Sequence, residues 1–447
     1  MKKSYIYLTI LATSFLVAFG FFYLYKGKQD PAVPQLKERQ GPISTTSEWL
    51  NTKAAIAGLQ RTLREKPNDH KSKLLLALAY MQEARVTGDH PYYYPAALKL
   101  INEVLDDKPE EAVMVYEATV AKASIQLSLH QFDKALATAK EAQAINDRGA
   151  AVYGVMCDAY VELGQYEEAI AMADKMTSLR PDLKSYSRVS YLREIHGDLP
   201  GAIEAMEAAV KAGFPGLEQT AWSRVNLGHL YEKTGDLAKA EIHYKIALVD
   251  YKQYAFALSG LGRIAMKKGQ IKEGHDLFVK AANTLPEFTF QEELVRYYQK
   301  QGQKGKAEDT LEELIEGMEE DQEAGHIVDL ELANIHMELK KDYPQALEYA
   351  LKEYERRPDN IDVNKTLANI YYHMQNYPKA SAHIKKATRT NSQDAELLCL
   401  NGLIDYKLGK LAAGQNLIRK SFTINPFQIT PVSLEGKKLL SSSLSKI

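Results

Sequence analysis

The chain has 447 residues, of which 45% are hydrophobic and 26% are charged, as is ordinary for a folded protein in water. Its formal net charge is −2, and this balance excludes a global positive field of the kind that holds nucleic acid phosphates. The two cysteines, Cys157 and Cys399, lie too far apart for a CxxC pair and have no clustered histidines at zinc-ligand spacing. We therefore expect no nucleic acid partner and no structural metal site.

Residues 6–25, IYLTILATSFLVAFGFFYLY, carry no charge. At about 1.5 Å per residue a helix of this length extends roughly 30 Å, which is enough to cross the hydrocarbon core of a bilayer. Tyrosines lie near both ends of the run and lysines lie beyond them, as in a span with interfacial anchors. We predict a transmembrane signal anchor at residues 1–25. The alternative is a cleaved signal peptide, because Ala18 and Gly20 are small residues of the kind that a signal peptidase requires.

Residues 26–46 contain three prolines, mixed charge and no apolar periodicity, which predicts a flexible linker. Thr45 and Glu48 have the spacing of a capping box and place the start of the first helix near Trp49. Lysines flank both ends of the apolar run, so the charge rule does not fix its orientation. The short MKK start is typical of anchors whose bulk is exported, and we expect the remainder on the extracytoplasmic side of a bacterial cell membrane.

A small residue recurs every 33 to 39 positions, near the start of a helical segment. Glycine-containing turns such as GQYEEA and GDLAKA precede it, and a proline often closes the unit. Each unit therefore reads as two antiparallel helices joined by a glycine turn. The recurring residues are Ala97, Ala135, Ala169, Ala202, Ala240, Gly274, Ala307, Ala346, Ala380 and Gly414.

The segments AYVELGQYEEAIAMADKMTSLRPD, LGHLYEKTGDLAKAEIHYKIAL and NIYYHMQNYPKASAHIKKA resemble the tetratricopeptide repeat. The resemblance covers about Lys71 to Pro426. It implies an all-α fold, a right-handed α-solenoid of about ten helix-turn-helix units across residues 47–430, in which each unit buries its apolar face against its neighbours. Residues 431–447 then supply a C-terminal capping helix or tail. No unit carries the family's tryptophan, although Trp222 stands close to its place in one.

Catalytic motifs are absent from the sequence: it contains no HExxH, GxxxxGK[ST] or GxSxG. The eleven histidines are scattered singly, and His326 reads as a surface or capping residue. We expect no enzyme, no catalytic, metal-binding or cofactor-binding residue, no cofactor and no small-molecule substrate.

In the tetratricopeptide repeat family the first helix of each unit lines the concave side, where peptides commonly bind. The resemblance therefore implies a ladder of side chains along a groove. Arginine grips carboxylates with two parallel hydrogen bonds, so we expect protein or peptide partners with acidic groups. The alternative is that these residues are solvated and paired with acids such as Glu232 or Glu292. The ladder comprises Asp158, Tyr191, His229, Arg263, Arg296, Asn334 and Asn369, with Lys267, Lys300 and Lys365 one helical turn away from three of them.

The stretch GDHPYYYPAAL, residues 88–98, places three tyrosines between two prolines. Its Tyr94-Pro95 pair matches Tyr343-Pro344, so Pro95 is predicted to be the first residue of a second helix. His90, Tyr92 and Tyr93 are then expected in a loop. They form either an accessory contact patch or a packing contact with the neighbouring unit.

The sequence as a whole predicts a non-catalytic scaffold, a membrane-tethered repeat domain in a cell-envelope complex. The alternative is an exported soluble adaptor that is released by cleavage of the N-terminal segment.

Overall fold

The computed structural model describes residues 35–39, 43–44 and 47–444. Regular structure within these ranges is entirely helical. The predicted membrane anchor at residues 1–25 lies outside the described residues. Among the helices that are described, none combines the length and the apolar composition needed to cross a bilayer.

Ten antiparallel helix pairs follow a single leading helix, α2 (Ser47–Glu65), and precede a single closing helix, α23 (Pro431–Leu444). The predicted α-solenoid of about ten units is thereby confirmed, whereas its right-handed twist stays a prediction. The pairs are α3 (His70–Thr87) with α4 (His90–Asp106), α5 (Ala112–Ser128) with α6 (Phe132–Ile145), α7 (Ala150–Glu162) with α8 (Tyr166–Leu179), α9 (Leu183–Ile195) with α10 (Leu199–Ala212), α11 (Glu218–Lys233) with α12 (Leu237–Asp250), α13 (Ala255–Lys267) with α14 (Ile271–Thr284), α15 (Phe288–Lys300) with α16 (Lys304–Glu323), α17 (Asp329–Ile335) and its π-helical continuation η2 (His336–Lys340) with α18 (Tyr343–Arg356), α19 (Ile361–His373) with α20 (Tyr377–Ala387), and α21 (Ala395–Lys407) with α22 (Leu411–Ile424).

The small residues that mark the repeat lie where the two helices of a pair touch. Ala135 and Ala169 are completely buried in the first turns of α6 and α8, and Ala97 is completely buried further along α4. An added Cβ at Gly414 in α22 would lie 2.5 Å from the carbonyl oxygen of Gly402 in α21. Only a residue without a side chain permits this approach of two backbones. The period in the sequence therefore follows from helix packing.

The first pair differs from its prediction. Helix α4 begins at His90, with Pro91 in its first turn and Pro95 inside the helix, instead of beginning at Pro95. Pro91 has the φ that a helix start requires, and Pro95 removes only one further backbone hydrogen bond. The earlier start places Tyr93 in the core, where its side chain is fully buried.

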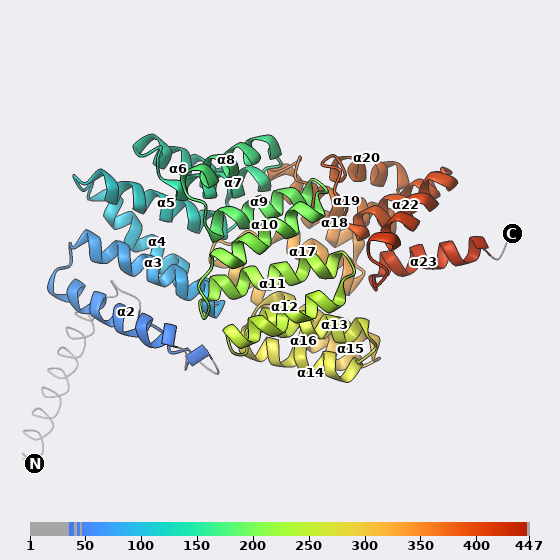
Figure 1. The fold of residues 1–447 in the computed structure, drawn as a ribbon, viewed down its shortest axis with the longest axis horizontal. Coiled ribbons are helices and arrows are strands. Elements are labelled where there is room, and N and C mark those ends of the chain that lie inside the picture. Colours follow the sequence, from blue (N-terminus) through green and yellow to red (C-terminus); the bar gives the residue numbers. More distant parts are fainter. Residues whose placement is uncertain (1–34, 40–42, 45–46, 445–447) are drawn as a thin grey trace, which may run out of the picture.

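The helix pairs wind into a superhelix whose successive turns touch, and in Figure 1 α17–α19 lie behind α9 and α10. The backbone N–H of Ile327 donates to the carbonyl of Leu129 (3.1 Å), and Nδ2 of Asn360 donates to the carbonyl of Glu162 (2.9 Å). These bonds join turns that follow first helices to loops that follow second helices, and we call this line of contacts the seam.

The seam has a constant period along the chain. His130 contacts Ile327 at a separation of 197 residues, and Asn425 donates to the carbonyl of Glu232 at a separation of 193 residues. At Gly164, between those positions, an added Cβ would lie 2.3 Å from the carbonyl oxygen of Asp359. One turn of the superhelix therefore takes up almost six helix pairs, and its inner side is enclosed.

Residues 35–39 pack against the first pair, which corrects the prediction of a flexible linker across 26–46 for this part of it. Arg39 forms an ion pair with Glu83 in α3 at 2.5 Å, and neither side chain is exposed. The Tyr92 hydroxyl donates to the carbonyl of Gln35 (2.7 Å), and the backbone N–H of Lys37 donates to the Tyr93 hydroxyl (3.1 Å). The tyrosines thus hold the N-terminal segment.

Single helices close both ends of the solenoid. Helix α2 packs on α3, and α23 packs on α21 and α22, where the sequence predicts a C-terminal capping helix or tail. Tyr372 illustrates the second contact, since its hydroxyl donates to Glu435 in α23 (2.6 Å). Both terminal pairs therefore bury an apolar face that would otherwise meet water.

Candidate functional site

Two adjoining cavities lie on the inner side of the superhelix. The larger, of about 950 Å³, is bordered by Tyr191, Trp222 and Phe256, and we call it the aromatic cavity. The smaller, of about 610 Å³, we call the acidic cavity. Both are lined mainly by first helices of the pairs, as the family resemblance implies for the ladder. Asp158 and Glu162 in α7 border both cavities, which therefore adjoin at this helix.

The aromatic cavity presents large apolar side chains to solvent. Leu78, Tyr191 and Trp222 are 40%, 38% and 39% exposed. Apolar surface in a concave site is the usual mark of a binding surface. Arg188 in α9 lines this cavity and joins α9 to α7, because its Nε donates to Asp158 (2.8 Å) and to the carbonyl of Gly154 (3.1 Å).

The acidic cavity holds more carboxylates than cations. Its cationic side chains are Arg296, Arg357 and Lys365. Burial, partly offset by arginine neighbours, raises the pKa of both Glu162 and Glu292 to about 7. The excess of acids over cations therefore rests on the residues that line the cavity, and burial favours the neutral form of two of these acids. The carboxylates are Asp158, Glu162, Glu292, Glu331, Glu338, Asp362 and Glu396.

The basic pair expected in the middle of the groove, Arg263 and Lys267, shares one acidic partner. Nη2 of Arg263 lies 3.1 Å from Glu232, and Nζ of Lys267 lies 2.7 Å from the same carboxylate. Burial alone would raise the pKa of Glu232, but Arg263 and Lys267 overcome that effect and hold it well below its usual value. Neither cation lines the two cavities, and Lys300 does not line them either.

Two further cations of the predicted groove are paired as well. Arg296 contacts Glu292 at 2.8 Å and Glu338 at 2.6 Å. Lys365 lies 3.3 Å from Glu396. The alternative drawn from the sequence, that these residues pair with neighbouring acids, therefore describes the arginines and Lys365. The cations that line the acidic cavity are outnumbered by its carboxylates.

Two ladder residues keep a buried polar atom without a hydrogen-bond partner among the described residues. They are Nε2 of His229, in the aromatic cavity, and Oδ1 of Asn369, in the acidic cavity. Burial, assisted by Arg263, lowers the pKa of His229 to about 3, so its imidazole is neutral. Asn334 lines the acidic cavity too, but its Oδ1 accepts from Thr366 (3.0 Å). An atom that is buried and unsatisfied is costly unless a partner supplies the missing bond.

His90, Tyr92 and Tyr93, the residues of the possible accessory contact patch, have different environments in the structure. Tyr93 is fully buried and Tyr92 binds the N-terminal segment, so packing accounts for both tyrosines. His90 instead borders the aromatic cavity.

Several cavity residues were not among the sequence candidates, notably Glu162, Arg188 and Arg357. Glu162 stands one helical turn beyond Asp158 and could have been found from the ladder, whereas Arg357 reaches the cavity only across the seam.

Comparison with protein families gives two matches. Residues 126–193 match one model of the tetratricopeptide repeat, and residues 195–255 match a second. Residues 126–255 of the chain therefore match tetratricopeptide repeats almost continuously. The two matched segments cover less than a third of the chain, and no curated protein matches its sequence.

Solved structures with similar folds include other repeat proteins. TTC0263, a thermophilic TPR protein of Thermus thermophilus, is 23% identical over 40% of this chain and 91% of its own, with a TM-score of 0.35. PilW, a type IV pilus biogenesis factor, is 17% identical over 46% of this chain and 97% of its own, with a TM-score of 0.38. The human IFIT1 dimer with PPP-AAAA is 14% identical over 84% of this chain and 88% of its own, with a TM-score of 0.43.

Proposed function

We propose that this chain is a non-catalytic scaffold that holds a segment of a protein partner in its two inner cavities. The observation that carries the proposal is the inward exposure of Leu78, Tyr191 and Trp222 beside the unpartnered polar atoms of His229 and Asn369. Apolar walls with a few placed polar groups are the ordinary composition of a ligand site. The seam encloses the inner side of the superhelix, which favours an extended segment over a folded domain.

The charge of the cavities favours a partner segment that is apolar in one part and basic in another. The sequence predicted acidic groups on the partner, but the cations that would hold them already contact carboxylates, such as Glu232 and Glu338. Lysine or arginine of the partner would compensate the excess negative charge of the acidic cavity. Apolar or aromatic side chains would cover Trp222 and Tyr191 in the aromatic cavity.

We further propose that residues 6–25 tether the scaffold to a membrane, with the solenoid in a cell-envelope complex on the extracytoplasmic side. The proposal rests on the uncharged run itself and on the attachment of Gln35 to Tyr92. Only residues 26–34 join the end of the run to this attachment, and a chain of that length spans at most about 35 Å. The first helix pair would then stay close to the bilayer surface.

The tether and its alternative, an exported soluble adaptor, differ in the mature N-terminus. Mass spectrometry of the protein from the membrane fraction should find residues 6–25 retained. A mature chain that begins after Gly20 and is recovered from the soluble fraction would establish the adaptor instead.

Removal of the inward aromatic side chains tests the binding proposal. The double substitution Tyr191→Ala, Trp222→Ala should lower the recovery of cross-linked partners from membranes at least tenfold. Leu351→Ala with Val249→Ala is the matched control, because these residues are also exposed but lie on second helices outside the two cavities. Equal recovery by the two double variants, both folded by circular dichroism, would refute binding in the aromatic cavity.

A further inference from the structure

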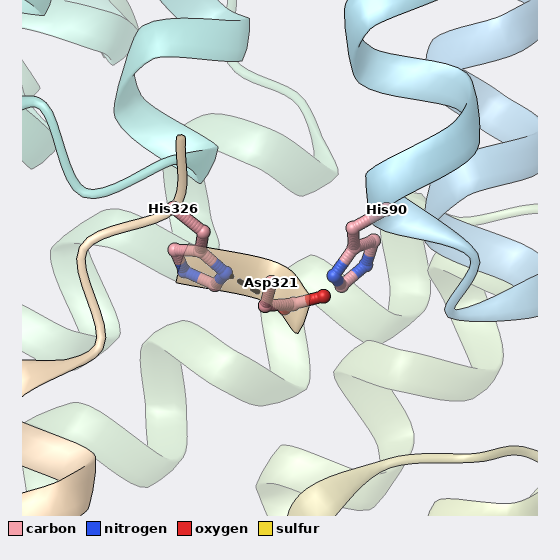
Figure 2. A group of neighbouring side chains, drawn as sticks. All are labelled: His90, Asp321 and His326. Atoms are coloured by element: carbon pink, nitrogen blue, oxygen red, sulfur yellow. Dashed lines mark hydrogen bonds and ion pairs between the residues drawn. The ribbon is translucent and has the colours of Figure 1, made fainter. Parts of the chain in front are cut away.

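Two histidines and one aspartate meet at the seam, outside the acidic cavity. His90 is the first residue of α4, Asp321 lies in the last turn of α16, and His326 lies in the loop between α16 and α17. Each offers one ligand atom, and these atoms all lie within 4.8 Å of one another. Figure 2 shows the Asp321 carboxylate between the two imidazole rings, with His90 on one side and His326 on the other.

The backbone around this cluster is fixed by the seam. The Ile327 N–H donates to Leu129, and Nε2 of Gln131 donates to the carbonyl of Gly325 (2.9 Å). These two bonds hold both sides of His326 against the turn between α5 and α6. The cluster therefore joins the first helix pair to the seventh through positions that the fold already keeps close together.

The side chain of His326 keeps one ring nitrogen available beside the aspartate. Imidazole coordinates a metal through a ring nitrogen, and the other nitrogen is commonly held by a carboxylate. His326 Nδ1 lies 2.9 Å from Asp321 Oδ2, while its Nε2 is buried without a hydrogen-bond partner among the described residues.

The charge around the cluster also favours a cation. Asp321 is 6% exposed, and a further acid, Glu331, lies 3.7 Å from the neighbouring His130. A buried carboxylate without a compensating charge is costly, and a divalent ion is a compact group that would offset it.

We propose that His90, Asp321 and His326 bind one divalent transition-metal ion, of which Zn²⁺ fits the ligand set best, and that the ion clamps the seam. Imidazole and carboxylate are common zinc ligands at about 2.0–2.2 Å, which separates neighbouring ligand atoms by roughly 3.3 Å. The side chains therefore close by about 1.5 Å or less at the widest pair. The sequence predicted no metal site because His90 is more than 200 positions away from Asp321 and His326, and the three converge only when the superhelix closes.

Zinc titration of the full chain in detergent, after treatment with a chelator, tests the site. Isothermal calorimetry should find one strongly bound Zn²⁺ per chain. His90→Ala combined with His326→Ala should weaken that binding at least tenfold. The control is His275→Ala, a histidine of α14 that contacts Asp276 and lies away from the seam. Wild-type protein that binds no Zn²⁺, or a double variant that binds it as the control does, would overturn the proposal.

Two further measurements keep the test independent of folding defects. Asp321→Asn keeps the shape of the side chain and should also weaken binding at least tenfold while circular dichroism stays unchanged. Zn²⁺ should slow hydrogen exchange at the Ile327 amide in the wild type, because the clamp opposes opening of the seam. Unchanged exchange at Ile327 with Zn²⁺ bound would place the ion elsewhere and contradict the clamp.

Discussion

Arg357, at the end of α18, pairs with Glu162 of α7, although 195 positions separate the two residues in the chain. The guanidinium also contacts Glu353 on its own helix and packs over the ring of Phe132 at 4.8 Å. Only 4% of the Arg357 side chain is exposed. One side chain thus links two turns of the superhelix and borders the acidic cavity, so the seam and the candidate site share a structural element.

Arg357→Ala should destabilise the fold strongly. The substitution leaves the buried Glu353 without this partner, and breaking a buried pair typically costs about 3–5 kcal/mol. Urea denaturation measures the free energy of unfolding. Arg419→Ala, at an exposed position in α22, is the control and should change it by less than about 0.5 kcal/mol. Similar small effects of both substitutions would mean that the seam contributes little.

Two glycine substitutions should change the stability of the protein in opposite directions. Gly414→Ala forces a Cβ to 2.5 Å from the Gly402 carbonyl oxygen, and overpacking of this kind costs about 1–3 kcal/mol. Gly305→Ala, in α16, meets no atom within 4 Å and should stabilise by up to about 1 kcal/mol. Thermal unfolding of both variants checks this. A Gly414→Ala protein as stable as the wild type would contradict the close packing of α21 and α22.

The docking of residues 35–39 on the first helix pair should depend on the buried ion pair between Arg39 and Glu83. Arg39→Ala leaves the fully buried Glu83 carboxylate without its bidentate partner, and we expect a loss of about 3–5 kcal/mol in the docking of residues 35–39. Hydrogen exchange at the Lys37 amide, which donates to Tyr93, reports this docking. Glu38→Ala removes an exposed pair with Lys53 and should have an effect of less than about 1 kcal/mol. Fast exchange in the wild type would show that the segment is undocked.

Ionisation of Glu292 should lower the free energy of unfolding as the pH rises. Burial raises its folded pKa to about 7, so the folded state holds a proton that the unfolded state, with its ordinary lower pKa, has released. The resulting stabilisation is complete below the unfolded pKa and is lost as the pH rises through about 7. Glu292→Gln stays neutral, so its stability relative to the wild type should increase between pH 5 and pH 8. Parallel thermal melts that show a constant difference would mean that Glu292 titrates normally.

The local parts of this architecture could be predicted from the sequence. The small residues at Ala97 and Gly414 marked the contact between paired helices, and the ladder placed Tyr191 and His229 on the inner face. Both inferences depend on interactions within a unit or between adjacent units, which recur with the period of the repeat. Even the pairing of Arg263 with Glu232, 31 residues away, was open to sequence reasoning as an alternative.

The contacts of the seam could not be predicted, because they depend on the pitch of the superhelix. Small rotations between pairs accumulate over almost six units before Glu162 meets Arg357. The same accumulation brings His90 to Asp321. The predicted start of α4 is also too late. Pro95 aligns with the prolines that begin other second helices, whereas α4 begins at His90 with Pro91 in its first turn.

Photo-crosslinking from inside the superhelix tests the central claim most directly. A photoreactive phenylalanine analogue replaces Tyr191 in one protein and Leu351 in another; the two residues are 38% and 39% exposed, but only Tyr191 lines the aromatic cavity. Irradiation of membranes followed by mass spectrometry should give covalent adducts to an apolar and basic partner segment from position 191 and none from position 351. Adducts of equal yield at both positions, or adducts from position 351 alone, would contradict binding in the inner cavities.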